Sequence, residues 1–239
     1  MAFRTDPGLL RQGTVADARV DEGLRSYMLS VYNYMGLGLA ITGVVAFLVA
    51  STPALYIPIF TTPLKWVVML APLGFVFFLG AKLQTMSIGA AQMTFWAFAA
   101  VMGLSMASIL LVFTGESVAR VFFITAATFG ATSLYGYTTK RDLSGFGSFL
   151  FMGLIGIIIA SLVNIFLQSS ALQFAVSVIG VLVFTGLTAY DTQRIKEVYY
   201  QVEGSEMLGR AAIMGALSLY LDFINMFTML IQLFGTARE

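Results

Sequence analysis

Seven long apolar stretches constrain this chain more than any other feature of its sequence. An α-helix needs about 20 mostly apolar residues to cross a bilayer, and each stretch meets or approaches that length. The stretches lie at 27–50, 64–80, 90–113, 118–139, 146–167, 171–193 and 208–234. The sequence therefore predicts an all-α membrane protein in which seven transmembrane helices form a bundle in the lipid bilayer.

The composition supports a lipid-embedded chain. Of 239 residues, 59% are hydrophobic and 10% are charged, whereas roughly a quarter are charged in an average soluble domain. The formal net charge is only +1, so the overall balance gives no support to nucleic-acid binding.

Polar segments define three regions. Residues 1–26 are polar and mixed in charge, without the apolar run of a signal peptide, so we expect an N-terminal tail. The membrane domain is expected over 27–235, with a short C-terminal tail at 236–239. The loops are short, apart from the proline-containing 51–63 and the polar stretch after the sixth span, where that helix is expected to continue past the bilayer by two or three turns.

Positive charges predict the orientation, because Lys and Arg concentrate on the cytoplasmic side. With the N-terminus in the cytoplasm, the inside segments hold ten of the 13 Lys and Arg residues, and the outside segments hold only Lys65, Arg120 and Arg238. We therefore expect a multi-pass protein with its N-terminus in the cytoplasm and its C-terminus outside.

The chain has no cysteine and no histidine. This excludes disulfides, thiolate nucleophiles, the usual zinc sites and every Ser-His-Asp or Cys-His catalytic arrangement. Any chemistry must use carboxylates, hydroxyls, amides, Lys or Arg, and we expect neither a catalytic site nor a tightly bound cofactor.

Asp222 lies near the middle of the last apolar stretch, where it cannot reach either membrane surface. A charged side chain at this depth costs about 3 kcal/mol on insertion scales, so such residues usually have a function. The alternative is an Asp that joins helices by hydrogen bonds. Helical spacing places a stripe of small and polar residues on one face, which must point into the bundle: Gly215, Ser218, Asp222, Asn225, Met229 and Gln232.

Asp191 ends the sixth apolar stretch, and Arg194 follows one turn later. By itself it could be an interfacial carboxylate. If the sixth and seventh helices form a long hairpin, however, Asp191 and Asp222 lie within a turn or two in depth and could meet across the helix interface.

Such a pair would titrate as one coupled unit, with two macroscopic pKa values that belong to the pair and not to either residue. When ionised it could also attract a hard cation, since calcium takes six to eight oxygen ligands, and Ser218 and Asn225 could contribute to them. Lys82, at the cytoplasmic end of the second span, could extend to the membrane surface or pair with a carboxylate.

Three segments resemble the Bax inhibitor-1 family, also called the transmembrane Bax inhibitor motif family, in its bacterial branch. They are residues 133–144, residues 186–193 with Tyr190-Asp191, and residues 219–225 with Leu221-Asp222. The resemblance runs from about Leu24 to Gly235.

The resemblance implies a seven-helix fold with the seventh helix central, located in the bacterial inner membrane. It also implies a pH-sensitive calcium leak governed by two aspartates, here Asp191 and Asp222. We expect Ser218, Asn225 and Tyr190 to be the polar residues that support the pair. In the family's described mechanism an arginine of the second helix latches onto the aspartates. This sequence has no arginine there, and Lys82 is the candidate latch.

Two other functions are considered. Intramembrane aspartyl proteases also place aspartates on adjacent helices, but their Gly-x-Gly-Asp motif is replaced here by Leu219-Tyr220-Leu221-Asp222. Some bacterial relatives modulate a membrane-bound AAA protease, so the alternative to a channel is a regulator that acts by protein interaction, with the N-terminal tail as the feature to test.

Overall fold

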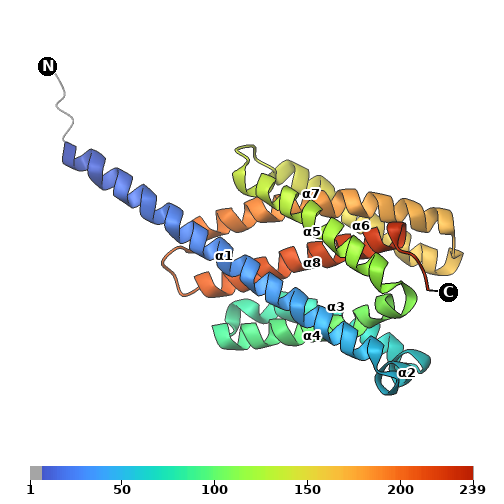
Figure 1. The fold of residues 1–239 in the computed structure, drawn as a ribbon. Coiled ribbons are helices and arrows are strands. Elements are labelled where there is room, and N and C mark those ends of the chain that lie inside the picture. Colours follow the sequence, from blue (N-terminus) through green and yellow to red (C-terminus); the bar gives the residue numbers. More distant parts are fainter. Residues whose placement is uncertain (1–6, 239) are drawn as a thin grey trace.

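The computed structural model describes the backbone of residues 7–238 and the side chains of residues 21–238. The first six residues of the predicted N-terminal tail, Arg4 among them, and Glu239 of the predicted C-terminal tail lie outside the described residues. The described chain is helical along almost its whole length (Figure 1). Its elements are α1 (Pro7–Ser51), α2 (Pro53–Thr61), α3 (Leu64–Lys82), the 3-10 turn η1 (Leu83–Thr85), α4 (Ile88–Val112), α5 (Gly115–Thr138), α6 (Ser144–Leu167), α7 (Ser170–Val202) and α8 (Leu208–Phe234).

Seven of the helices in the described chain are long and apolar enough to cross a membrane: α1 from Asp21, α3 with η1, and α4 to α8. The predicted seven-helix membrane bundle is therefore confirmed. The structure adds α2 within the proline-containing segment 51–63. Pro53 is the first residue of α2, where a missing backbone N–H costs nothing.

Local sequence explains where several spans begin. Ser87, Thr114 and Ser169 precede α4, α5 and α7, and each side chain accepts a hydrogen bond from a backbone N–H of the first turn. Such caps satisfy N–H groups that have no partner within the helix. The connections can therefore be short, and α7 starts only three residues after α6 ends.

Helix α7 extends to Val202, as the sequence predicted, and α8 starts at Leu208. Gly204 in the connection has a φ of 72°, a conformation that glycine adopts at little cost. The two helices therefore form a long antiparallel hairpin. At the other end of the hairpin, α7 starts beside the polar end of α8, where Gln173 and Ser177 donate hydrogen bonds to Gln232.

Helix α8 is the most buried of the spans. In its most apolar window 67% of residues are buried, compared with 11% for α3 and 11% for α6. It packs against α1, α4, α5 and α7, whereas α3 packs mainly on α4, and α6 mainly on α7 (Figure 1). The described core therefore forms around α8, and the least buried spans lie at the periphery.

Both ends of α8 are tied to neighbouring segments. At its start, Arg210 Nη1 donates to the carbonyls of Gln84 (2.7 Å) and Met86 (3.4 Å). Beyond its end, the Arg238 amide donates to the Val112 carbonyl (2.8 Å), and Arg238 Nε donates to that of Phe113 (3.0 Å). The residues after α8 thus bind the connection between α4 and α5.

Candidate aspartate pair between α7 and α8

The polar stripe of α8 faces α7. Gly215 lies against Ile195, since a Cβ on the glycine would come 3.1 Å from that side chain. Met229 packs on Gly180 in the same way, and Gln232 bonds to Gln173 and Ser177. Three levels of the stripe therefore meet one face of α7, as expected for residues that must point into the bundle.

These contacts fix the level of Asp222. Along the sequence of α8, Asp222 is midway between Gly215 and Met229. Along α7, Thr188 is almost midway between Gly180 and Ile195, the residues that these two contact. Antiparallel packing thus sets Asp222 level with Thr188, and Asp191 is one turn of α7 from that position. One turn corresponds to about 5 Å along the axis.

Asp222 is a buried carboxyl with an unpartnered oxygen. Its side chain is 5% exposed, and Oδ2 has no hydrogen-bond partner among the described residues. A buried charge without a partner is strongly disfavoured. The environment of Asp222 therefore suits a group that carries a proton or meets a positive charge.

Asp191 is the neighbouring acidic group. It is half-buried, and it lies close enough for its charge to act on Asp222. Arg194, one turn further along α7, is exposed and near enough to attract the Asp191 carboxylate. The pair is thus asymmetric, because Asp222 is enclosed and Asp191 lies on the side toward the end of the hairpin.

Two supporting residues lie on the same stripe of α8. Ser218 is half-buried, about one turn before Asp222. Asn225 is also half-buried, and its Nδ2 donates to the Leu221 carbonyl of its own helix (2.8 Å). This bond uses the amide nitrogen, and Oδ1 of Asn225 accepts no hydrogen bond from the described residues, so it can act as a ligand.

The structure separates Tyr190 and Lys82 from the pair. The Tyr190 ring packs on Gly147 of α6, where a Cβ would come 2.5 Å from the ring. Lys82 is exposed at the end of α3, where its carbonyl accepts from Thr85 Oγ1 (2.9 Å). None of the described contacts joins Lys82 to either aspartate.

A chain of hydroxyls beside Asp191 was not foreseen from the sequence. Tyr32 and Ser133 lie 2.6 Å apart, Ser133 and Thr192 lie 2.9 Å apart, and Thr192 donates to the Thr188 carbonyl (2.7 Å). The chain links α1, α5 and α7, and its member Thr192 follows Asp191 in the sequence. Ser133 and Thr192 fall within the segments that carry the family resemblance, which is the signal that could have identified them.

The loop between α5 and α6 is held by α7. Gln193 Oε1 accepts from the Leu143 amide (2.9 Å), and its Nε2 donates to the Arg141 carbonyl (2.8 Å). In the same loop Asp142 Oδ1 accepts from the Ser144 amide (2.8 Å), and its hydrogen bonds with Ser144 lower the pKa of Asp142. Gln193, which follows Thr192 of the hydroxyl chain, therefore anchors this loop to α7.

The two aspartates form a pair and not a larger acidic cluster. Within the described part of the chain, no three Asp or Glu side chains come together in a way that could hold a metal ion.

Comparison with known proteins places the chain in a family. The family model described as "Inhibitor of apoptosis-promoting Bax1" matches residues 24–239. The inner membrane protein YbhL of Escherichia coli K12 is 49% identical over 219 residues, covering 90% of this chain and 94% of YbhL. An uncharacterized protein of Caulobacter vibrioides is 48% identical over 234 residues (94% of each chain), and an uncharacterized membrane protein of Streptococcus pyogenes is 35% identical over 227 residues (90% and 94%).

The residues matched by the family model span the predicted membrane domain and include both aspartates. With seven apolar spans and an inner membrane protein among its relatives, the chain is a multi-pass membrane protein. It belongs to the Bax inhibitor-1 family.

Proposed function

We propose that this protein is a pH-sensitive cation leak, with calcium as the conducted ion, gated by protonation of Asp191 and Asp222. The observation that carries the proposal is the unpartnered, buried Oδ2 of Asp222 beside a second carboxyl. Neither a purely structural Asp nor an isolated interfacial carboxylate needs this arrangement. Membership of the family adds support. The segments around both aspartates resemble those of the family, and this resemblance implies a pH-sensitive calcium leak.

Charge repulsion supplies the gating step. Two like charges in a buried helix interface repel each other more strongly than they would in water, because the effective dielectric constant there is lower. At low pH a shared proton removes this repulsion, and α7 and α8 stay packed. At higher pH both carboxylates are charged, so their repulsion favours a rearranged interface and their charge attracts a cation.

The ion would be held weakly. Two carboxylates offer up to four oxygens, and Asn225 Oδ1 and water could add others toward the six to eight that calcium takes. Incomplete coordination by protein groups is compatible with conduction, because an ion must leave a site as readily as it enters. On this proposal Lys82, exposed at the end of α3, is not required as a latch.

Flux measurements test the proposal. The full-length protein is reconstituted into liposomes that contain a calcium indicator, and entry is measured between about pH 5 and pH 8. D191N and D222N should each change both the calcium flux and its pH dependence. D21N, at an exposed position of α1, is the matched control and should behave as the wild type. If both D191N and D222N keep the wild-type flux and pH response while remaining folded, the proposal is wrong.

A regulatory role is the second candidate, favoured by the length of α1. This helix has 45 residues, from Pro7 to Ser51, whereas about 20 are enough to cross a bilayer. Its first part extends away from the bundle (Figure 1). Such an extension could contact a membrane-bound AAA protease. A variant lacking residues 2–20 should then lose co-purification with that protease while keeping its flux, and unchanged co-purification would exclude this role for the extension.

A further inference from the structure

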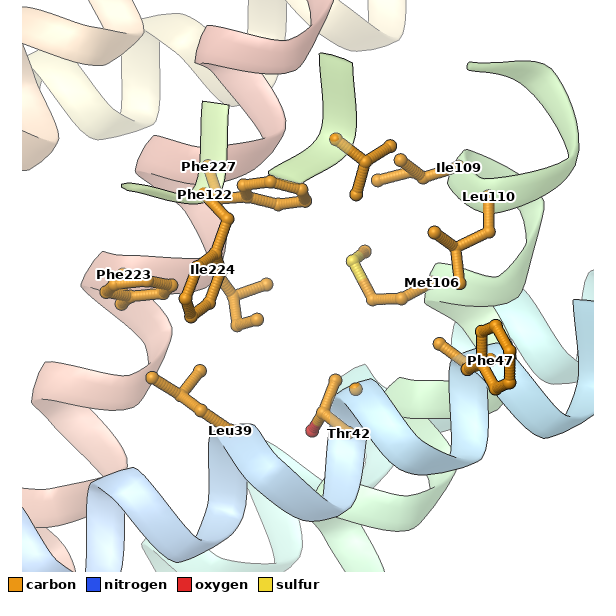
Figure 2. Close-up of a pocket in the computed structure, with 13 residues that line it drawn as sticks. Leu39, Thr42, Phe47, Met106, Ile109, Leu110, Phe122, Phe223, Ile224 and Phe227 are labelled. Atoms are coloured by element: carbon orange, nitrogen blue, oxygen red, sulfur yellow. The ribbon is translucent and has the colours of Figure 1, made fainter. Parts of the chain in front are cut away.

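An apolar pocket lies between α1, α4, α5 and α8 (Figure 2). Its volume is about 270 Å³. The side chains that define its walls include Leu39, Phe47, Met106, Phe122, Ile224 and Phe227. The pocket is distinct from the aspartate pair, because its walls do not include α7.

All lining residues lie at a similar depth in the membrane. They come from the later part of α1, the end of α4, the start of α5 and the second half of α8. Successive spans alternate in direction, so α1, α4 and α8 run one way and α5 runs the other. The four segments therefore share the half of the bundle farther from the α7–α8 connection. In the predicted orientation this is the outer leaflet.

The pocket opens toward lipid between α1 and α5. The exposed lining residues come from these two helices: Gly43 and Phe47 on α1, and Phe122 on α5, with Phe47 65% exposed and Phe122 40% exposed. Helix α1 packs mainly on α4 and α8, whereas α5 packs mainly on α7 and α8. The opening therefore faces hydrocarbon, because it lies within membrane spans.

The residues that line the pocket offer few hydrogen-bond partners to a water molecule. Thr42 supplies the hydroxyl labelled in Figure 2, and this group already contacts the Gly38 carbonyl (3.0 Å), the Ala99 carbonyl (2.8 Å) and Tyr220 Oη (2.6 Å). A buried water needs two to four polar partners, and an apolar cavity of about 150 Å³ is known to stay dry and to take benzene. An empty pocket of this size would also forfeit dispersion contacts along its walls.

We propose that this pocket binds an acyl chain of a membrane lipid, which enters from the bilayer between α1 and α5. The chain supplies the contacts that the walls lack, and its headgroup stays at the membrane surface nearest the pocket. Gly43 lies in the pocket wall at this entrance, and the space where its Cβ would stand is open. The proposal does not depend on the function of the aspartate pair.

Photocrosslinking tests the proposal. The full-length protein is placed in nanodiscs with a phospholipid that carries a diazirine on its acyl chain, and labelled residues are identified by mass spectrometry after illumination. Ile224 is only 7% exposed and lies in the pocket wall, whereas Phe149 on α6 is 65% exposed and serves as the reference for general lipid contact. Labelling of Ile224 and Met106 together with Phe149 is the expected result.

A pair of glycine variants locates the bound chain. G43F should fill the pocket and remove most of the labelling of Ile224 and Met106, with labelling of Phe149 unchanged. G36F, at an exposed glycine of the same helix that also has open space around it, should leave all labelling unchanged. If G43F does not fold, G43L replaces it.

Two outcomes would overturn the proposal. One is that Phe149 is labelled in the wild-type protein but Ile224 and Met106 are not. The other is that a folded Gly43 variant labels Ile224 and Met106 as strongly as the wild type. Since no flux is measured, a failure here is separate from a failure of the proposed gating.

Discussion

Gly136 of α5 lies directly against the backbone of Ala189 on α7. A Cβ on Gly136 would come 2.9 Å from the Ala189 carbonyl carbon, closer than real Cβ atoms approach backbone. The contact brings α5 within reach of the segment that carries Tyr190, Asp191 and Thr192. Close approach of two helices through a small residue is a common packing mode in membranes.

The variant G136A should therefore destabilise the protein by about 1–3 kcal/mol, because backbone atoms cannot move aside as a flexible side chain can. The exposed Gly130 of the same helix has open space around it. G130A should be neutral or slightly stabilising, since alanine favours helix by about 1 kcal/mol over glycine. Thermal unfolding in detergent compares the two, and equal stability of G136A and G130A would contradict this account.

The Thr42–Tyr220 bond predicts an asymmetric pair of variants. Both side chains are buried and lie 2.6 Å apart. Y220F removes one hydrogen bond, at a cost of about 1 kcal/mol, whereas T42V leaves the buried Tyr220 hydroxyl without a partner, at a cost of about 1–3 kcal/mol. The double variant should be more stable than T42V alone. Unfolding midpoints of the four proteins form the double-mutant cycle, and additive effects would contradict coupling.

The two hydrogen bonds of Gln193 should stabilise the loop between α5 and α6. In Q193E the side chain can still accept from the Leu143 amide, but it loses the donor to the Arg141 carbonyl and sets a carboxylate against it. The loop should then open more often, and amide hydrogen exchange at residues 141–147 should accelerate. Q201E, at an exposed position of the same helix, is the control and should leave this exchange unchanged.

Asp142 predicts a pH-dependent contribution to stability. Its hydrogen bonds with Ser144 lower the pKa of Asp142 below the usual value of 3.8. A pKa lowered by folding stabilises the folded state above the usual pKa and loses that effect as the pH falls through the folded value. D142A should therefore unfold at a lower temperature than the wild type at neutral pH, and the difference should shrink below pH 3.8.

The variant D142N gives the matching control for this prediction. Its amide oxygen can still accept from the Ser144 amide, but it does not titrate. The difference in unfolding temperature between D142N and D142A should stay constant with pH. A wild-type advantage over D142A that persists unchanged into acid would show that the charge of Asp142 is not involved.

The sequence predicted the spans well because lipid imposes a length and a composition on each of them. The same reasoning predicted which face of α8 points into the bundle, since Asp222 could not face lipid. It also predicted the extension of α7 to Val202, where no helix breaker intervenes. Helix α2 was not predicted, because Pro53 and Pro58 suggested a loop, although proline is well tolerated at the first position of a helix.

Contacts between helices could not be predicted in the same way. Hydroxyls such as Thr192 and Thr42 bond to carbonyls of their own helix as well as to partners on other helices, so the pattern along the chain does not reveal the partner. Tyr190 adjoins Asp191 in sequence, but successive residues of a helix point about 100° apart. Its ring therefore packs on α6, whereas Asp191 lies near α8.

The attachments at both ends of α8 limit how this protein can change shape. A shift of the helix along its axis would break the Arg210 bonds to residues 84 and 86, or the Arg238 bonds to residues 112 and 113. A tilt or a small rotation would strain them much less. These bonds hold α8 to the two ends of α4, so conformational change in this bundle should occur as movement of the other helices relative to α4 and α8. Helix α7, which shares the polar interface of α8, should be the first to move.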